Sequence, residues 1–124
     1  MYYAILLDTK SSSKLSVFNE YETSFCHHVT IAYNPHRGVD EFFSPYVGEK
    51  IWMNVVSVHK NPIIQAAKIS ILHSFIRRVD YGVTHCTMSA QKGIKPWYSN
   101  PMLLGENKMK RISMRISGSL VKID

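Results

Sequence analysis

The chain has 124 residues, of which 45% are hydrophobic and 19% are charged, and it carries a formal net charge of +6 at pH 7. Its length predicts a single domain over residues 1–124, since domains commonly contain about 100–150 residues, and its two cysteines exclude a disulfide framework and a cysteine-rich zinc site. No apolar run approaches the roughly 20 residues of a membrane-spanning helix, and the first residues lack a secretion signal, so we expect a cytoplasmic protein that does not enter a membrane.

The first half of the chain contains mainly strand patterns. Residues 2–8 are a short apolar run and predict a first strand, and the weak alternation of residues 14–19 predicts a second. Residues 27–33 predict the next strand. One short helix is expected within residues 39–47. It should end near Pro45, because the residue before a proline avoids the helical conformation.

The second half continues the strand pattern. Branched and aromatic residues predict a strand over 50–60. Residues 61–72 fit both a helix face and a strand, and the short link before them favours a hairpin with 50–60. Another strand is expected over 83–90, and turn residues predict a loop over 91–101.

The last segment, residues 111–123, alternates along its whole length and predicts one long strand with a kink at Gly118. Strands therefore dominate. The expected class is strand-rich α+β, or all-β, with little helix.

Two of the predicted strands carry the same four-residue pattern. The first tetrad is His28-Val29-Thr30-Ile31, and the second tetrad is His85-Cys86-Thr87-Met88. Alternate residues of a strand face the same side. Each tetrad therefore presents a histidine and a threonine on one face, backed by two apolar residues on the other. If the two strands lie side by side, four polar side chains converge.

This set of side chains suits the hydrolysis of a phosphodiester. Histidine has an unperturbed pKa near neutrality, so that one imidazole can act as base and a second as acid, each typically contributing about 10²–10⁴-fold in rate. Threonine hydroxyls can donate hydrogen bonds to phosphate oxygens. A single His-x-Thr triplet arises often by chance, but two in strand context at a domain-sized separation favour a function.

These tetrads resemble those of the two-histidine phosphoesterase superfamily. The surrounding stretches HHVTIAYNP and THCTMSAQKGIKPWYSN are similar to the cyclic phosphodiesterase modules of fungal-type tRNA ligases and to small viral and phage relatives. The likeness covers about residues 27–104. It implies a bilobal α+β fold, with antiparallel sheets around a central cleft that holds both tetrads.

The resemblance also implies an activity. It predicts hydrolysis of a 2′,3′-cyclic phosphate at an RNA end or on a nucleotide, without metal or cofactor. By analogy, His85 is the base and His28 the acid. This chain is short for the family and leaves little sequence for outer helices, which predicts a more open cleft or an oligomer that closes it.

Several residues outside the tetrads are candidates for substrate binding. Lys92 and Lys95 can hold phosphates, or they are ordinary solvated loop lysines. Trp97 and Tyr98 can stack on a base, or they pack the loop onto the sheet. Tyr3 can approach the cleft from the first strand.

Other polar residues have structural interpretations. With regular alternation, Tyr33 shares the face of Val29 and belongs to the core, and His27 points away from the phosphate. A disulfide between Cys26 and Cys86 and a zinc site built from Cys26 and the histidines are minor alternatives, since no ligand spacing supports the zinc site. A basic cluster either steers phosphates or protects an edge strand; it comprises Lys108, Lys110, Arg111 and Arg115.

The high positive charge suits a polyanionic partner, with nucleic acid or a nucleotide first. Two alternatives to an RNA-end phosphodiesterase stay open. One is a viral or phage enzyme that degrades cyclic or 2′–5′ oligonucleotide second messengers and so blunts host immune signalling. The other is an inactive module that only binds RNA ends.

Overall fold

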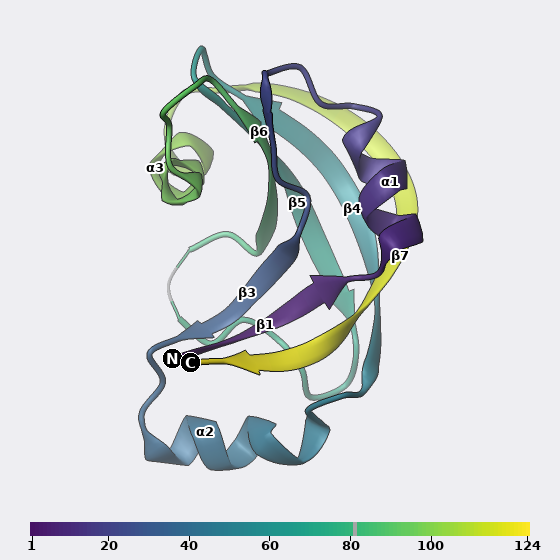
Figure 1. The fold of residues 1–124 in the computed structure, drawn as a ribbon, viewed down its shortest axis with the longest axis vertical. Helices are drawn as coiled ribbons and strands as arrows, with labels where there is room; N and C mark the ends of the chain where they lie inside the picture. The colour runs from purple at the N-terminus through teal and green to yellow at the C-terminus, as the bar shows by residue number, and fades with distance from the viewer. Residues whose placement is uncertain (81) are drawn as a thin grey trace.

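A computed structural model of the chain describes residues 1–80 and 82–124 (Figure 1). Short 3₁₀ turns at Ser44–Tyr46 and Pro96–Tyr98 accompany the main elements. In chain order these are β1 (Tyr2–Leu7), α1 (Thr9–Ser16), β2 (Thr23–Ser24), β3 (His28–Tyr33), α2 (Arg37–Phe43), β4 (Lys50–Lys60), β5 (Ile64–Leu72), β6 (His85–Ala90), α3 (Ser99–Leu104) and β7 (Lys108–Ile123). The expected strand-rich α+β class is confirmed.

The strands described form one antiparallel sheet that closes on itself. Its order is β2-β6-β3-β1-β7-β4-β5, and a further pairing of β5 with β6 completes the ring. Two lobes with a sheet each were expected, whereas these strands belong to a single closed sheet (Figure 1). β7 pairs with β1 only over residues 118–123, so the part of β7 that carries the basic cluster pairs with β4 alone, as the edge-protection interpretation expects.

The hydrophobic core fills the inside of this closed sheet. Alternate residues of each strand point inward, which follows from the period of two along a strand. The core also receives Leu15 from α1 and Phe43 from α2. Its fully buried strand residues include Tyr3, Ile5, Val29, Ile31, Ile51, Met53, Cys86, Met88 and Leu120.

The prediction of a strand over residues 14–19 is wrong, because α1 spans Thr9–Ser16. The Asp8 carboxylate accepts the Ser11 N–H at 2.8 Å and caps the helix. The Ser11 hydroxyl accepts the main-chain N–H of Ser117 on β7, also at 2.8 Å. The helix is thus stabilised by a cap and by a contact with a distant strand. The alternation of polar and apolar residues predicts neither of these contacts.

The other predicted elements agree with the structure more closely. The hairpin of residues 50–60 with 61–72 is confirmed, and Lys60 lies opposite Gln65 at its turn. The short helix before Pro45 is confirmed as α2. The predicted loop over 91–101 contains a 3₁₀ turn and the start of α3. No helix within residues 1–80 and 82–124 is long and apolar enough to cross a membrane.

Gly118 allows β7 to pass close to β1. The strand continues through this residue, and a Cβ atom placed on it meets the Leu6 carbonyl oxygen at 2.3 Å and the Ile5 side chain at 2.9 Å. The first of these atoms is backbone within a paired strand and cannot move aside easily. A glycine is therefore required by space at this point of the ring.

We predict that Gly118→Ala lowers the free energy of unfolding by about 1–3 kcal/mol, the usual cost of overpacking a core. Urea titration followed by circular dichroism measures the change. Gly38→Ala is the matched control, because the Gly38 Cβ position meets its nearest atom at 3.5 Å and alanine favours a helix. Equal stability of Gly118→Ala and the parent chain contradicts the close approach.

Candidate active site

The two tetrads meet where β3 pairs with β6. Val29 and Cys86 lie directly opposite each other in this antiparallel pair, and both are fully buried in the core. Antiparallel pairing sets the next residues against each other in reverse order. His28 and Thr87 therefore lie at one end of this pair, and Thr30 and His85 lie at the other.

All four polar side chains of the tetrads line one pocket of about 780 Å³ on the outer face of this strand pair. That volume falls within the roughly 300–1,000 Å³ of small-molecule sites. In Figure 1, α3 lies outside the sheet beside β6. Three further groups complete the wall: Tyr2, Phe25, His27 and Tyr33 around β3, then Arg78, Asp80 and Gly82 before β6, and Pro96, Trp97, Asn100 and Leu104 after it.

Hydrogen bonds fix the His85 ring in one tautomer. Its Nδ1 lies 2.7 Å from the Val83 carbonyl oxygen. A carbonyl oxygen only accepts, so Nδ1 carries the proton of the neutral ring and Nε2 keeps a free lone pair. Arg78 Nη1 donates to the same carbonyl at 2.9 Å. The outcome is an imidazole whose basic nitrogen is Nε2.

The pKa of His85 is lowered from its ordinary value. Burial is the largest cause, and the Arg78 cation and His28 add to it. The hydrogen bond to Val83 and the charge of Asp80 oppose the shift. At neutral pH the ring is therefore neutral, which is the form that a general base needs.

An ion pair behind His85 holds the loop between β5 and β6 against β3. Arg78 Nε contacts a carboxylate oxygen of Asp80, and the Arg78 side chain is only 10% exposed. The other Asp80 oxygen accepts the main-chain N–H of Tyr33 at 3.3 Å. The N–H of Val79 donates to the Ile31 carbonyl at 3.1 Å. The loop that carries the His85 acceptor is thus fixed to the strand of the other tetrad.

The pKa of His28 is also lowered, first by burial and then by the neighbouring His27. Its ring centroid lies 6.0 Å from that of Tyr2. Both tetrad histidines therefore favour the neutral form in the free protein. A bound phosphate anion works in the opposite direction, since a nearby negative charge stabilises the imidazolium.

A buried serine supports the threonine of the second tetrad. Thr87 Oγ1 lies 2.8 Å from Ser99 Oγ and donates to the Pro96 carbonyl at 3.3 Å. Since Thr87 has one hydroxyl proton, Ser99 is the donor when Thr87 points at Pro96. Ser99 is fully buried at the start of α3. This contact leaves the Thr87 hydroxyl free to turn its proton toward a ligand.

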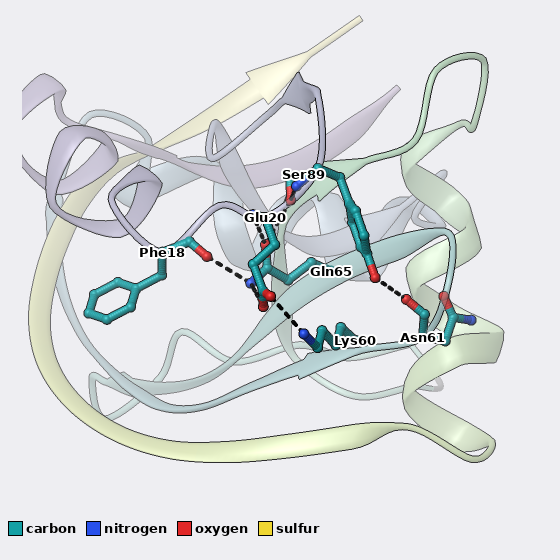
Figure 2. A network of polar contacts seen from close by, with 7 residues as sticks. Phe18, Glu20, Lys60, Asn61, Gln65 and Ser89 are labelled. Carbon is teal, nitrogen blue, oxygen red and sulfur yellow. Dashed lines mark hydrogen bonds and ion pairs between the residues drawn. The ribbon is translucent and has the colours of Figure 1, made fainter.

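A polar network positions the chain between α1 and β3. The Gln65 side chain is 1% exposed, and its oxygen accepts from Ser89 Oγ at 2.7 Å and from the Glu20 N–H at 3.1 Å. Its amide nitrogen donates to the Phe18 carbonyl at 2.9 Å. Figure 2 shows these contacts joining residues 18–20 to β5 and β6.

The same network extends to the turn between β4 and β5. Lys60 Nζ pairs with a Glu20 carboxylate oxygen at 2.6 Å, and the Tyr21 hydroxyl donates to the Asn61 carbonyl at 2.5 Å (Figure 2). The Tyr21 N–H donates to Ser89 Oγ at 3.2 Å. These bonds hold residues 18–21, which precede the first tetrad, along β6, the strand that carries the second tetrad.

The substrate-binding candidates divide into two groups. Trp97 lines the pocket and is 58% exposed. Its ring stacks on Tyr98 with centroids 4.1 Å apart, but Tyr98 itself packs on a small apolar cluster outside the sheet. Lys92 and Lys95 do not line the pocket. The main-chain N–H of Lys92 donates to Glu22 instead.

Tyr3 does not reach the pocket, and the expectation that it would is corrected. Its ring is fully buried, and its hydroxyl donates to the Asp40 carboxylate at 2.5 Å. Burial and this carboxylate raise the pKa of Tyr3 to about 12. Tyr2 has the opposite parity on β1 and lines the pocket. The prediction chose the wrong tyrosine, because an apolar strand pattern does not show which of its two faces is buried.

Tyr33 and His27 were also placed on the wrong side. The pairing of β1 with β3 shifts at Ile31, so that Ile31 and Ala32 are both buried and Tyr33 returns to the pocket face. Such a bulge inverts the alternation beyond it. Cys26 has a φ of 55°, outside the strand region. β3 begins at His28, so strand alternation does not apply to His27, which lines the pocket.

Both cysteines are free and buried. Cys26 Sγ lies 3.5 Å from Asn19 Oδ1 and 3.6 Å from the Met88 carbonyl oxygen. Burial raises the pKa of the Cys26 thiol to about 11. The zinc alternative required this thiol beside the pocket histidines, whereas it belongs to the hydrophobic core.

Comparison with known protein families and with curated proteins finds no match to this chain. The resemblance to two-histidine phosphoesterases therefore rests on the two tetrads and the stretches around them.

We predict that His28 and His85 both titrate below the value of about 6.5 typical of an unperturbed histidine. The measurement is NMR titration of the imidazole signals, with His28→Gln and His85→Gln as assignment variants. Because folding lowers both pKa values, the unfolded state binds protons first as the pH falls through 6.5. Stability should therefore decline in that window, and it should decline less in either variant. A midpoint above 6.5 for either ring contradicts the assigned surroundings.

Proposed function

We propose that this chain is a two-histidine phosphodiesterase that opens a 2′,3′-cyclic phosphate at an RNA end or on a nucleotide. The observation that carries the proposal is the β3–β6 register, which brings both tetrads to the floor of one pocket. His28 and His85 are diagonal neighbours across this pair, a relation that separates backbones by about 7–8 Å. Two rings at that spacing can flank a single phosphorus atom.

The hydrogen bonds of His85 support its assignment as the base. Its Nε2 takes a proton from a water molecule, and the water oxygen forms a bond to phosphorus. The bond from phosphorus to one ribose oxygen breaks, and that oxygen receives the proton of His28 Nε2. Thr30 and Thr87 donate to the non-bridging oxygens as negative charge increases there. The two rings have then exchanged protonation states, and solvent resets them.

His28 must enter this cycle protonated, although its pKa is lowered in the free protein. The substrate supplies the compensation, because its phosphate anion stabilises an imidazolium beside it. His85 is less suited to take that proton, since the Arg78 cation lies next to it. This asymmetry supports His28 as the acid. The cycle uses the side chains of the protein alone and needs no cofactor or metal.

The aromatic part of the pocket wall suits a nucleobase. Tyr2, Tyr33 and Trp97 line it, and stacking on an aromatic ring typically contributes about 1–3 kcal/mol per base. As part of the same proposal, β3 with β1 and β6 with β5 act as the two lobes of the family fold, with the pocket across their junction. RNA ends and free nucleotides in the cytoplasm are the substrates of this proposal.

A second-messenger phosphodiesterase of viral or phage type is the alternative within the same chemistry. A pocket of about 780 Å³ is large enough to favour more than one nucleotide, which supports this candidate. An inactive module that binds RNA ends is the third candidate, and the presence of both histidines and both threonines argues against it. Product analysis distinguishes the three: a monophosphate end, a linearised messenger, or no product.

We predict that His28→Ala and His85→Ala each lower the turnover of a 2′,3′-cyclic nucleotide by at least about 10²-fold, the lower end of an acid–base contribution. The assay is a panel of cyclic mononucleotides, cyclic-ended RNA, 2′–5′ oligoadenylate and cyclic dinucleotides. His36→Ala is the matched control, since this histidine is exposed and lies outside the pocket. Full activity of either tetrad variant excludes the two-histidine mechanism.

We predict that Arg78→Met shifts the acidic limb of the kcat/KM profile to higher pH. The Arg78 cation lowers the pKa of His85, so its removal lets the base protonate at a higher pH. Arg78→Lys keeps the charge and should restore most of the profile, while it loses part of the loop contact with Val83. A loss of kcat with an unmoved limb means that Arg78 acts on the fold of the loop alone.

A further inference from the structure

The outer surface of β5, β4 and β7 carries an exposed set of basic and aromatic side chains beside the pocket. We call it the basic face and define it by Lys50, Trp52, Lys68, Arg111 and Arg115. All five are exposed, and the Trp52 side chain is 45% exposed. Exposed Trp52 and Leu72 lie opposite each other on β4 and β5, so the basic residues surround an apolar patch.

The basic face is connected to the candidate active site by one row of cross-strand neighbours. Lys68 on β5 lies directly opposite His85 on β6. Ser57 on β4 lies opposite Lys68, and Arg111 on β7 lies opposite Ser57. Neighbouring strands are about 4.8 Å apart. The row therefore leads from the proposed base to Arg111 in three such steps.

A second row runs parallel to the first and carries the next cation. Arg115 lies opposite Asn54 and donates to its side-chain oxygen at 3.0 Å. Trp52 is two residues away on β4, on the same outward side. The Lys50 ammonium lies over the Trp52 ring, 4.5 Å from its centroid. That contact is weak at an exposed site, so a nucleobase can replace it.

The charge of these strands is one-sided. Strands β4, β5, β6 and β7 contain no aspartate or glutamate, and they carry eight of the 15 lysines and arginines. Two acidic residues lie near Lys50: Glu49, which pairs with His73 at 2.9 Å, and Asp8, whose carboxylate accepts hydrogen bonds from Ser11 and Ser117. Cations interleaved with an aromatic ring are the composition that binds single-stranded nucleic acid without sequence preference.

We propose that the basic face binds the single-stranded RNA that precedes the cyclic phosphate held in the pocket. This inference rests on the proposed function and narrows its substrate to an RNA end. Lys68, Arg111 and Arg115 contact successive phosphates, and Trp52 stacks on a base. A second messenger of two or three nucleotides is too short to extend from the pocket across the whole face.

The test compares binding of a fluorescein-labelled oligouridine of about ten nucleotides with a 3′-phosphate end, a length within known single-strand site sizes. Arg111→Gln with Arg115→Gln removes two cations and keeps Lys68 beside His85. We expect the slope of log affinity against log salt to fall by about 1.4, or 0.7 per lost phosphate contact. Trp52→Ala should weaken binding at least about fivefold through lost stacking. Fluorescence anisotropy measures both.

Lys10→Gln with Arg37→Gln is the matched control, because it removes the same charge from two exposed residues outside the basic face. Equal weakening by this control overturns the proposal, since net charge alone then explains binding. Loss of self-association in Trp52→Ala without loss of RNA affinity also overturns it, with a second copy of the chain as the occupant. Binding needs no turnover, so inactivity toward both cyclic mononucleotides and cyclic-ended RNA rejects the proposed function, whereas an unchanged salt slope in the double variant rejects the basic face.

Discussion

The antiparallel pairing of β3 with β6 is the constraint on which the rest of the site depends. Val29 opposite Cys86 is its centre, and both side chains are buried in the core. A slip by one residue in either strand would turn a histidine and a threonine into the core and bring two apolar side chains to the surface. The free energy of core packing therefore also maintains the geometry of the polar face. The register of β3 and β6 therefore determines both the packing of the core and the arrangement of the tetrad side chains in the pocket.

The two histidines have similar burial but different neighbours, and this difference separates their proposed roles. His85 is held by a carbonyl oxygen that it shares with Arg78, so its tautomer and its neutral form are both favoured. His28 has the Tyr2 ring as a neighbour, and its pKa is lowered by burial and by His27. A substrate anion therefore favours the protonated form of His28 more than the protonated form of His85. Pairs of titratable groups in unequal surroundings are the usual basis of acid–base assignment.

Much of the fold and the centre of the site could be predicted from the sequence. Period-two alternation identified most strands and the shared face of each tetrad. The missed features share a physical cause, which is that they depend on contacts distant in sequence. The side of β3 on which Tyr33 lies follows from a bulge opposite β1. Helix α1 depends on a hydrogen bond between Ser11 and Ser117 of β7. Arg78 and Asp80 act through a loop that carries no local pattern.

The proposed chemistry requires two imidazoles to act on one phosphorus atom. The most direct measurement is a crystal structure of the chain with a uridine–vanadate complex, which mimics the five-coordinate phosphorus of the reaction. Nε2 of His28 and Nε2 of His85 should each lie at hydrogen-bond distance, about 2.7–3.2 Å, from oxygens of the same vanadate. Vanadate bound by only one of the two rings, or bound away from both, would contradict it.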